Sequence, residues 1–203
     1  MPARLGLLGG TFNPPHIGHL VCAQEALVGL ALDRVLLVPV REPPHKKVEV
    51  EPGLEHRVAM CCAAVEGEPR FGVSRVDADR PGPSYTADTL RALTGSGDDL
   101  WFIVGGDMAI SLPAWREPEA LLALARLGVA EREGVRRDDV VERLAAALPG
   151  AAARLDFFAM PRLDISSSLV RRRVREGLPL RYLVPDAVVA YIARERLYRD
   201  GGQ

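Results

Sequence analysis

The chain has 203 residues, and its 26 Lys and Arg against 27 Asp and Glu give a formal net charge of −1. Hydrophobic residues make up 48% and charged residues 26%, a balance typical of a globular protein with its own core and not of a disordered chain. The length favours one domain that needs no disulfide or structural metal. The near-zero net charge gives no support for a protein that coats nucleic acid or binds membranes through basic residues.

The three cysteines, Cys22, Cys61 and Cys62, have no spacing typical of a disulfide framework or a zinc site. Cys61 and Cys62 lie in an apolar helical pattern, and both are expected in the core. The first residues do not resemble a signal peptide, and no apolar stretch reaches the length that spans a bilayer. Together with reduced thiols, these features predict a cytoplasmic protein that has no membrane partner.

Short apolar runs alternate along the chain with segments of helical periodicity. In chain order, the pattern predicts a strand at residues 5–8, a helix at 17–32, a strand at 34–39, a helix at 54–65, a strand at 71–76, a helix at 84–94, a strand at 100–104, a helix at 118–125, strand 127–130, helix 138–148, strand 155–159 and helices at 166–175 and 185–196. This alternation predicts an α/β fold with a Rossmann-like, doubly wound parallel sheet. We expect one domain, with the sheet in residues 1–163 and a small helical part in 164–203.

The segment GGTFNPPHIGHL, residues 9–20, joins the first expected strand to the first expected helix. In a parallel sheet this junction lies at the carboxyl edge, where ligands bind. Gly9 and Gly10 allow backbone amides to approach an anion closely. His16 and His19 would lie on one face at the helix N-terminus, which favours phosphate. A Pro-Pro turn with two surface histidines is the alternative, as is a zinc site, for which the motif supplies no third ligand.

The segment DISSSLVRRRVR, residues 164–175, is the second candidate anion site. Ser166, Ser167 and Ser168 suit a helix N-terminus, and Arg171 follows about one turn later. Amides, hydroxyls and a guanidinium together would hold an anion. The alternative is an ordinary capped helix with a solvated basic face.

The first segment resembles the motif of the nucleotidyltransferase superfamily, whose H-x-G-H signature reads HIGH here. The second resembles that superfamily's phosphate-binding I-S-S-T motif, with Ser168 where Thr is usual. Five further segments make nearly the whole chain similar to the bacterial nicotinate-mononucleotide adenylyltransferase family: PPHKK (43–47), PSYTADTL (83–90), VGGDM (104–108), LPAWREPEALL (112–122) and YLVPDAVVAYI (182–192). This resemblance implies transfer of the adenylyl group of ATP to nicotinate mononucleotide, giving deamido-NAD and pyrophosphate in NAD biosynthesis.

The resemblance also implies roles for single residues. The residues implied to act on the reacting phosphates are His16, His19 and Arg171. Those implied to bind ATP are Gly9, Gly10, Thr11, Phe12, His45, Lys46, Gly105, Asp107, Ser166, Ser167 and Ser168. Those implied to bind the mononucleotide are Tyr85, Thr86, Trp115, Arg116 and Arg132. Mg²⁺ is the implied cofactor, held mostly by the ATP phosphates and water.

Some of these positions have a second interpretation. Trp115 has a spacing that is also typical of a core aromatic, and Asp107 is also a typical helix-capping residue. Arg132 is followed by Glu133 and Gly134, where the family has Pro-Gly, so the sequence departs from the family pattern there.

Three other functions remain open from the sequence. The chain could belong to another nucleotidyltransferase group, which accepts nicotinamide mononucleotide or phosphopantetheine. It could be a non-catalytic nucleotide sensor, or a tRNA-binding module related to the synthetases, which its short length disfavours. We expect no nucleic-acid partner, and association into a homo-oligomer stays open.

Overall fold

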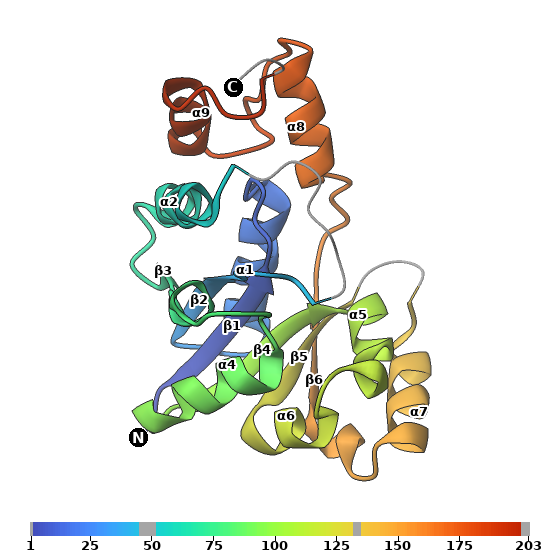
Figure 1. Cartoon of the computed structure of the whole chain (residues 1–203). Helices are drawn as coiled ribbons and strands as arrows, with labels where there is room; N and C mark the ends of the chain where they lie inside the picture. The colour runs from blue at the N-terminus through green and yellow to red at the C-terminus, as the bar shows by residue number, and fades with distance from the viewer. Residues whose placement is uncertain (1, 45–51, 132–134, 200–203) are drawn as a thin grey trace.

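A computed structural model describes residues 2–44, 52–131 and 135–199 (Figure 1). Within them the chain forms a six-stranded sheet in the order β3-β2-β1-β4-β5-β6, and every neighbouring pair is parallel. The strands are β1 (Arg4–Gly10), β2 (Arg34–Pro39), β3 (Phe71–Val73), β4 (Asp99–Gly105), β5 (Arg126–Glu131) and β6 (Leu155–Ala159). The order of the strands reverses between β1 and β4, which is the switch point of a doubly wound sheet. The predicted fold class is confirmed.

Helices cover both faces of this sheet (Figure 1). The helices of the described residues are α1 (Ile17–Gly29), α2 (Leu54–Val65), α3 (Val76–Asp79), α4 (Thr86–Leu93), α5 (Gly106–Ile110), α6 (Pro118–Leu124), α7 (Arg137–Ala147), α8 (Ser167–Arg175) and α9 (Asp186–Arg194), and the last two lie off the sheet. Alternate residues of β4 face opposite layers: Trp101 and Ile103 pack with α1, whereas Phe102 and Val104 pack with α4, α5, α6 and α7. The apolar runs predicted as buried strands therefore supply both halves of the core.

Some predicted boundaries were wrong. The strand predicted at 71–76 ends at Val73, and residues from Val76 onward form the short helix α3, in which Arg75 and Asp79 pair across one turn. Helix α5 was not predicted. Cys61 is fully buried, but Cys62 is exposed, because consecutive residues on a helix point in directions about 100° apart.

Helix α9 packs on α2, and α8 belongs to the same apolar cluster. A third apolar cluster joins Met60 of α2 to Val170 of α8, to Val188 and Ile192 of α9, and to Tyr198. This cluster holds α8 and α9 above the carboxyl edge of the sheet (Figure 1). The helical C-terminal part therefore lies next to the ends of β1 and β4.

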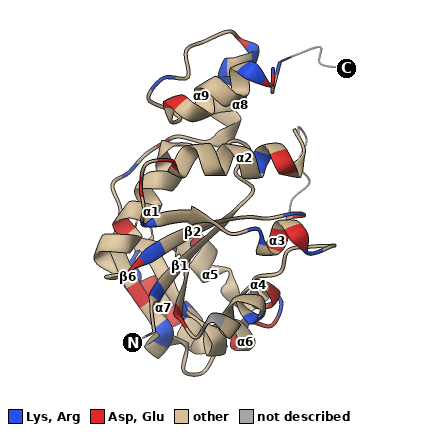
Figure 2. Ribbon diagram, turned by 90° about the vertical axis from the view of Figure 1, so that its left-hand side faces the viewer, with Lys and Arg blue, Asp and Glu red and all other residues tan. Residues whose placement is uncertain are grey.

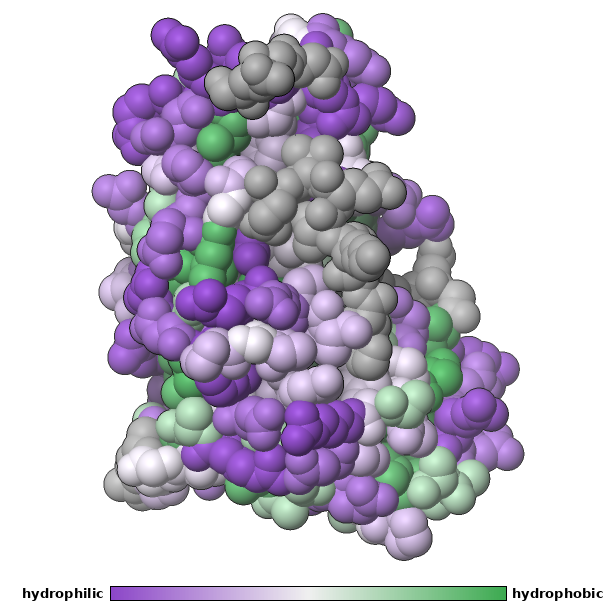
Figure 3. All heavy atoms as spheres, viewed as in Figure 1, coloured by the Kyte–Doolittle hydropathy of each residue, from purple (hydrophilic) through white to green (hydrophobic). Residues whose placement is uncertain are grey.

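The face of the molecule drawn in Figure 3 is mainly hydrophilic, with apolar residues in small separate patches. The large hydrophobic residues that are exposed are scattered over several elements: Val28, Met108, Leu178 and Tyr182. Among the residues that the structure describes, no helix combines the length and the apolar character needed to cross a membrane.

Candidate active site

The glycine-rich ends of β1 and β4 lie side by side at the switch point. The two strands pair in register up to Leu8 and Ile103, and each then runs into a glycine at the carboxyl edge. A Cβ on Gly10 would lie 3.0 Å from the Phe12 ring, and a Cβ on Gly105 would lie 2.7 Å from Oδ1 of Asp107. A side chain at either position would therefore push on a neighbouring residue of the proposed site. The structure thus brings the two glycine segments together at the carboxyl edge of the sheet.

The two motif histidines are in direct contact at the start of α1. His16 is the N-cap residue and is only 7% exposed. The His16 and His19 rings stack with their centroids 3.7 Å apart. The backbone N–H of His16 donates a hydrogen bond to Nδ1 of His19 at 3.1 Å. A nitrogen that accepts a hydrogen bond carries no proton, so Nε2 is the N–H donor of the His19 ring.

Phe12 completes this group with an unusual backbone conformation. It is buried with φ at 48°, in the left-handed region that residues other than glycine rarely adopt. The edge of its ring meets the His19 ring at a centroid distance of 4.9 Å. Such strain persists only where surrounding contacts hold it, and it is most common at functional sites.

The serine-rich motif reaches the same place from the other end of the chain. Ser167 donates its hydroxyl proton to the carbonyl oxygen of Pro14 at 2.8 Å. Arg171 donates from Nη1 to the carbonyl oxygen of Asn13 at 2.7 Å, and from Nη2 to Oγ of Ser168 at 3.2 Å. The two motifs are therefore hydrogen-bonded to each other, although about 150 residues separate them.

Ser166 is the N-cap of α8, as predicted, because its Oγ accepts the backbone N–H of Leu169 at 3.1 Å. Basic residues gather along this helix, as Figure 2 shows. The helix begins at the switch point and its last turn is basic, with Arg172, Arg173 and Arg175. The start of α8 thus faces the loop that follows β1, so a second helix N-terminus lies near that of α1, which carries the two histidines.

Two residues that lie outside the sequence motifs also hold the loop after β1. Arg57, in α2, donates to the carbonyl oxygen of Thr11 at 3.0 Å. The Tyr198 hydroxyl donates to Oδ1 of Asn13 at 2.7 Å. Neither residue was predicted from the sequence. Arg57 could have been noticed because it shares a helix face with Cys61, four residues on, and a charge on an apolar face is unusual.

The residues predicted to bind the mononucleotide form a second group, at the start of α4 and before α6. The Arg116 guanidinium lies 4.4 Å from the centre of the Tyr85 ring, and Thr86 is the first residue of α4. Trp115 is half-buried, with its ring 6.1 Å from Phe102 in an edge-to-face arrangement. Trp115 is therefore packed against Phe102 and still partly accessible, so it is not a fully buried core residue.

Three predicted residues, His45, Lys46 and Arg132, lie outside the described residues. Their predicted roles stay predictions. Asp107 is described and exposed; it is the second residue of α5, whose N-cap is Gly105, so it does not cap that helix.

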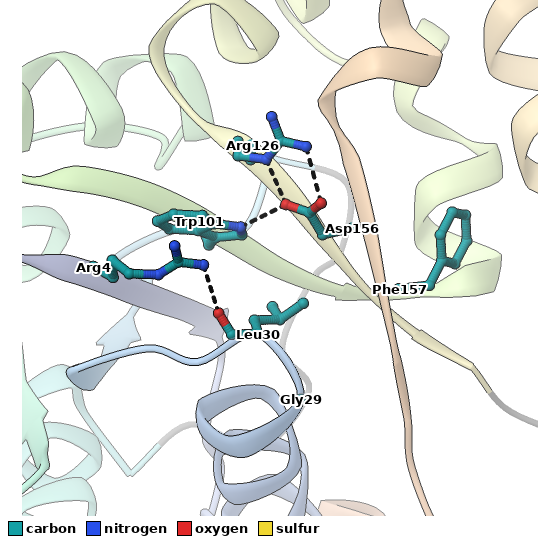
Figure 4. Close-up of a pocket in the computed structure, with 7 residues that line it drawn as sticks. All are labelled: Arg4, Gly29, Leu30, Trp101, Arg126, Asp156 and Phe157. Atoms are coloured by element: carbon teal, nitrogen blue, oxygen red, sulfur yellow. Dashed lines mark hydrogen bonds and ion pairs between the residues drawn. The ribbon is translucent and has the colours of Figure 1, made fainter.

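A different hollow, of about 460 Å³, lies at the opposite edge of the sheet, where the strands begin (Figure 4). Asp156 accepts hydrogen bonds from Arg126 at 2.5 and 2.9 Å and from Nε1 of Trp101 at 2.7 Å. Arg4 stacks on Trp101 at 4.5 Å and donates to the carbonyl oxygen of Leu30. The charged groups here pair with one another and join β1, β4, β5 and β6, which indicates a structural role.

Replacing Asp156 by asparagine is expected to lower the free energy of unfolding by about 1–3 kcal/mol at neutral pH, because Arg126 loses a charged partner while both side chains are 32% exposed. The hydrogen bonds from Arg126 lower the pKa of Asp156. A carboxylate with a lowered pKa stabilises the fold above its unfolded pKa, and this contribution is lost as the pH falls through the folded value. The difference between the two proteins should therefore shrink below about pH 4.

Urea unfolding of both proteins across this pH range measures the effect. Asp138→Asn is the matched control, since Asp138 pairs with Arg136 and both side chains are largely exposed. Equal stability of the Asp156→Asn protein and the parent at neutral pH would contradict the assignment.

The chain is similar in sequence and in fold to known proteins. The family model described as cytidylyltransferase-like matches residues 7–173. A probable nicotinate-nucleotide adenylyltransferase of Roseiflexus sp. (strain RS-1) is 48% identical over 97% of this chain and 98% of its own length. One from Thermomicrobium roseum is 44% identical over 97% of this chain and 92% of its own.

A solved structure with the same fold is the Plasmodium falciparum nicotinic acid mononucleotide adenylyltransferase complexed with NaAD, at a TM-score of 0.74 and 17% identity, covering 97% of each chain. The same Plasmodium falciparum enzyme complexed with APC superposes at a TM-score of 0.73 with 16% identity. The similarity in sequence covers both motifs and the strands that position them. The chain therefore belongs to the nicotinate-nucleotide adenylyltransferase family.

Proposed function

We propose that this chain transfers the adenylyl group of ATP to nicotinate mononucleotide, giving deamido-NAD and pyrophosphate, through the site at the ends of β1 and β4. The observation that carries the proposal is the hydrogen bonding of the serine-rich motif to the histidine motif, through Ser167 to Pro14 and Arg171 to Asn13. Glycine amides, two histidines, a helix N-terminus and a guanidinium then surround one position, a combination that suits a polyphosphate.

ATP would lie with its phosphates against the backbone of Gly9 to Phe12 and the start of α8. Ser166, Ser167 and Ser168 would contribute amides and hydroxyls there. Arg171 has five N–H donors, and the two nitrogens already bonded to protein oxygens leave other donors for phosphate. Asp107 is exposed at the end of β4, where its carboxylate would accept the ribose hydroxyls.

The reaction needs no strong base. The phosphate oxygen of the mononucleotide is already anionic, so it attacks the α-phosphorus of ATP in line while the bond to the pyrophosphate oxygen breaks. The protein contributes by positioning the two reactants and by stabilising the charge that moves onto the pyrophosphate. His19 supplies the Nε2–H donor described above, and His16 packs against it.

Mg²⁺ is part of this proposal and would arrive with the ATP. Within residues 2–44, 52–131 and 135–199, no three His, Cys, Asp or Glu side chains cluster as they would around a metal ion. This donor set fits an ion whose ligands are mainly phosphate oxygens and water. When bound, it would offset the negative charge of the phosphates.

The mononucleotide would occupy the second group of residues, with its pyridine ring on Trp115 and its carboxylate near Thr86 and Arg116. Arg116 is held against Tyr85, which presets its position. Because ATP is made and used inside cells, we also propose a cytoplasmic location.

Replacing Trp115 by alanine is expected to raise KM for the mononucleotide roughly tenfold, from the about 1–3 kcal/mol that stacking on one aromatic side chain contributes. KM for ATP should stay the same, because ATP contacts the other group of residues. Trp115→Phe keeps an aromatic face and should restore most of the loss. Steady-state kinetics with each substrate varied in turn measure both constants. An equal rise in both would instead indicate that Trp115 is a core residue.

The direct test of the proposed function is pyrophosphate release from ATP and Mg²⁺ with three acceptors in parallel: nicotinate mononucleotide, nicotinamide mononucleotide and phosphopantetheine. The proposal expects the highest kcat/KM with nicotinate mononucleotide. Release with only one of the other acceptors would reassign the substrate, and ATP binding without any release would identify a sensor.

A further inference from the structure

Arg57 is a buried charge for which no motif accounts. It lies in the first half of α2, and only 1% of its surface is exposed, which makes it the largest of the fully buried side chains described. Burying a guanidinium costs more free energy than burying an apolar side chain of similar size. An arginine here must therefore contribute something that a methionine or leucine would not.

The guanidinium of Arg57 is bonded to three backbone carbonyl oxygens. Nη1 donates to Thr11 at 3.0 Å and to Val40 at 2.7 Å, and Nη2 donates to Arg41 at 3.1 Å. These carbonyls belong to two different segments, one following β1 and one following β2, which are neighbouring strands. A single side chain thus fixes the distance between two segments as they leave the carboxyl edge of the sheet.

The contact with Thr11 also fixes an amide group. The carbonyl of Thr11 and the N–H of Phe12 belong to one planar trans peptide unit, so the two groups point in opposite directions. A donor bound to the Thr11 oxygen therefore sets the direction of the Phe12 N–H. Phe12 holds a left-handed φ of 48°, and this conformation requires contacts that outweigh its strain.

We propose that Arg57 is a positioning residue for adenylyl transfer. By holding the Thr11 carbonyl it aims the Phe12 amide toward the bound ATP phosphates, and by holding Val40 and Arg41 it keeps the neighbouring segment at a fixed distance. Arg57 acts through the backbone and does not touch the substrate. The inference rests on the function proposed above.

The test measures kcat, both KM values and the thermal unfolding midpoint for the parent chain and three variants. Arg57→Met is expected to lower kcat ten- to hundredfold, since a misplacement of about 1 Å in an active site costs up to about 10²-fold. KM for the mononucleotide should change less than kcat, because its residues lie on α4 and before α6 and are linked to the Arg41 segment through the hydrogen bond from the Arg41 N–H to Oγ of Ser84. Arg57→Lys should lose less than Arg57→Met and still fall below the parent, because an ammonium group cannot span the three carbonyls as a planar fork does.

Arg154→Met is the matched control. Arg154 is less buried than Arg57 but likewise donates to a backbone carbonyl, that of Leu122 at 2.8 Å, and it precedes β6 at the opposite edge of the sheet. Its loss should lower the unfolding midpoint and leave kcat unchanged. This contrast separates a general loss of stability from a loss of positioning.

The outcomes are distinct. If the Arg57 variants keep the parent kcat while folded, or if Arg57→Lys restores kcat completely, the positioning role is wrong. If Arg57→Met does not fold, the kcat of Arg57→Lys decides the question by the same criterion. If the parent chain itself releases no pyrophosphate with nicotinate mononucleotide, the proposed function fails first and this inference falls with it.

Discussion

Replacing His19 by alanine is expected to lower kcat for pyrophosphate release by roughly 10²–10³-fold, the loss typical of removing one donor that stabilises transition-state charge. The backbone N–H of His16 occupies Nδ1 of His19, so Nε2 is the nitrogen that donates. The ring is also held by stacking on His16 and by the edge of Phe12. A donor fixed in this way needs no reorganisation as charge develops on the phosphates. Rates at saturating ATP and nicotinate mononucleotide measure the effect.

Two controls make this test specific. His19→Asn keeps an acceptor near the place of Nδ1 and loses the donor at Nε2, so its kcat should be as low as that of the alanine variant. Full activity of His19→Asn would mean that His19 only caps α1. His56→Ala removes a histidine that is hydrogen-bonded to Tyr191 at 2.9 Å, on the contact of α2 with α9, and should leave kcat near the parent value.

Replacing Arg171 by methionine is expected to lower kcat roughly 10²-fold. Arg171 connects α8 to the loop after β1 through the Asn13 carbonyl and also contacts Ser168. Its loss removes a positive charge from the proposed phosphate site and also loosens the junction of the two motifs. Arg171→Lys should recover only part of the activity, because one ammonium group cannot make both contacts in the same geometry.

Arg173→Met is the matched control on the same helix. Arg173 also donates to a backbone carbonyl, that of Pro179 at 2.8 Å, but this contact lies on the loop after α8. Its replacement should leave kcat unchanged. If Arg171→Met and Arg173→Met give the same kcat and the same unfolding midpoint, the role assigned to Arg171 is wrong.

The sheet was predictable because each strand carries its own signal. The runs at residues 5–8 and 100–104 are short, apolar and followed by glycine, and both belong to strands that end at the switch point. The cap of α8 was predictable for the same reason, because Ser166 is a typical capping residue that stands directly before the helix. Signals of this kind depend on neighbours within about one helical turn.

The predictions that failed needed more than local pattern. Val76 looks like the end of a strand, but it begins a helical turn that an ion pair between Arg75 and Asp79 stabilises. Cys62 follows a buried cysteine, but the direction of the helix face, set by what α2 packs against, leaves it exposed. Helix α5 has only five residues, too few for a periodic signal.

The sequence by itself determined the alternating α/β elements, the residue types of two phosphate-binding motifs and the resemblance that names their chemistry. Only the tertiary structure decided that these motifs touch, because the contacts of Ser167 and Arg171 with Pro14 and Asn13 depend on the apolar cluster that holds α8 in place. It also decided that Arg57 is buried under the loop after β1. The periodicity of the sequence shows which face of a helix is apolar, but chain topology determines which element packs against that face.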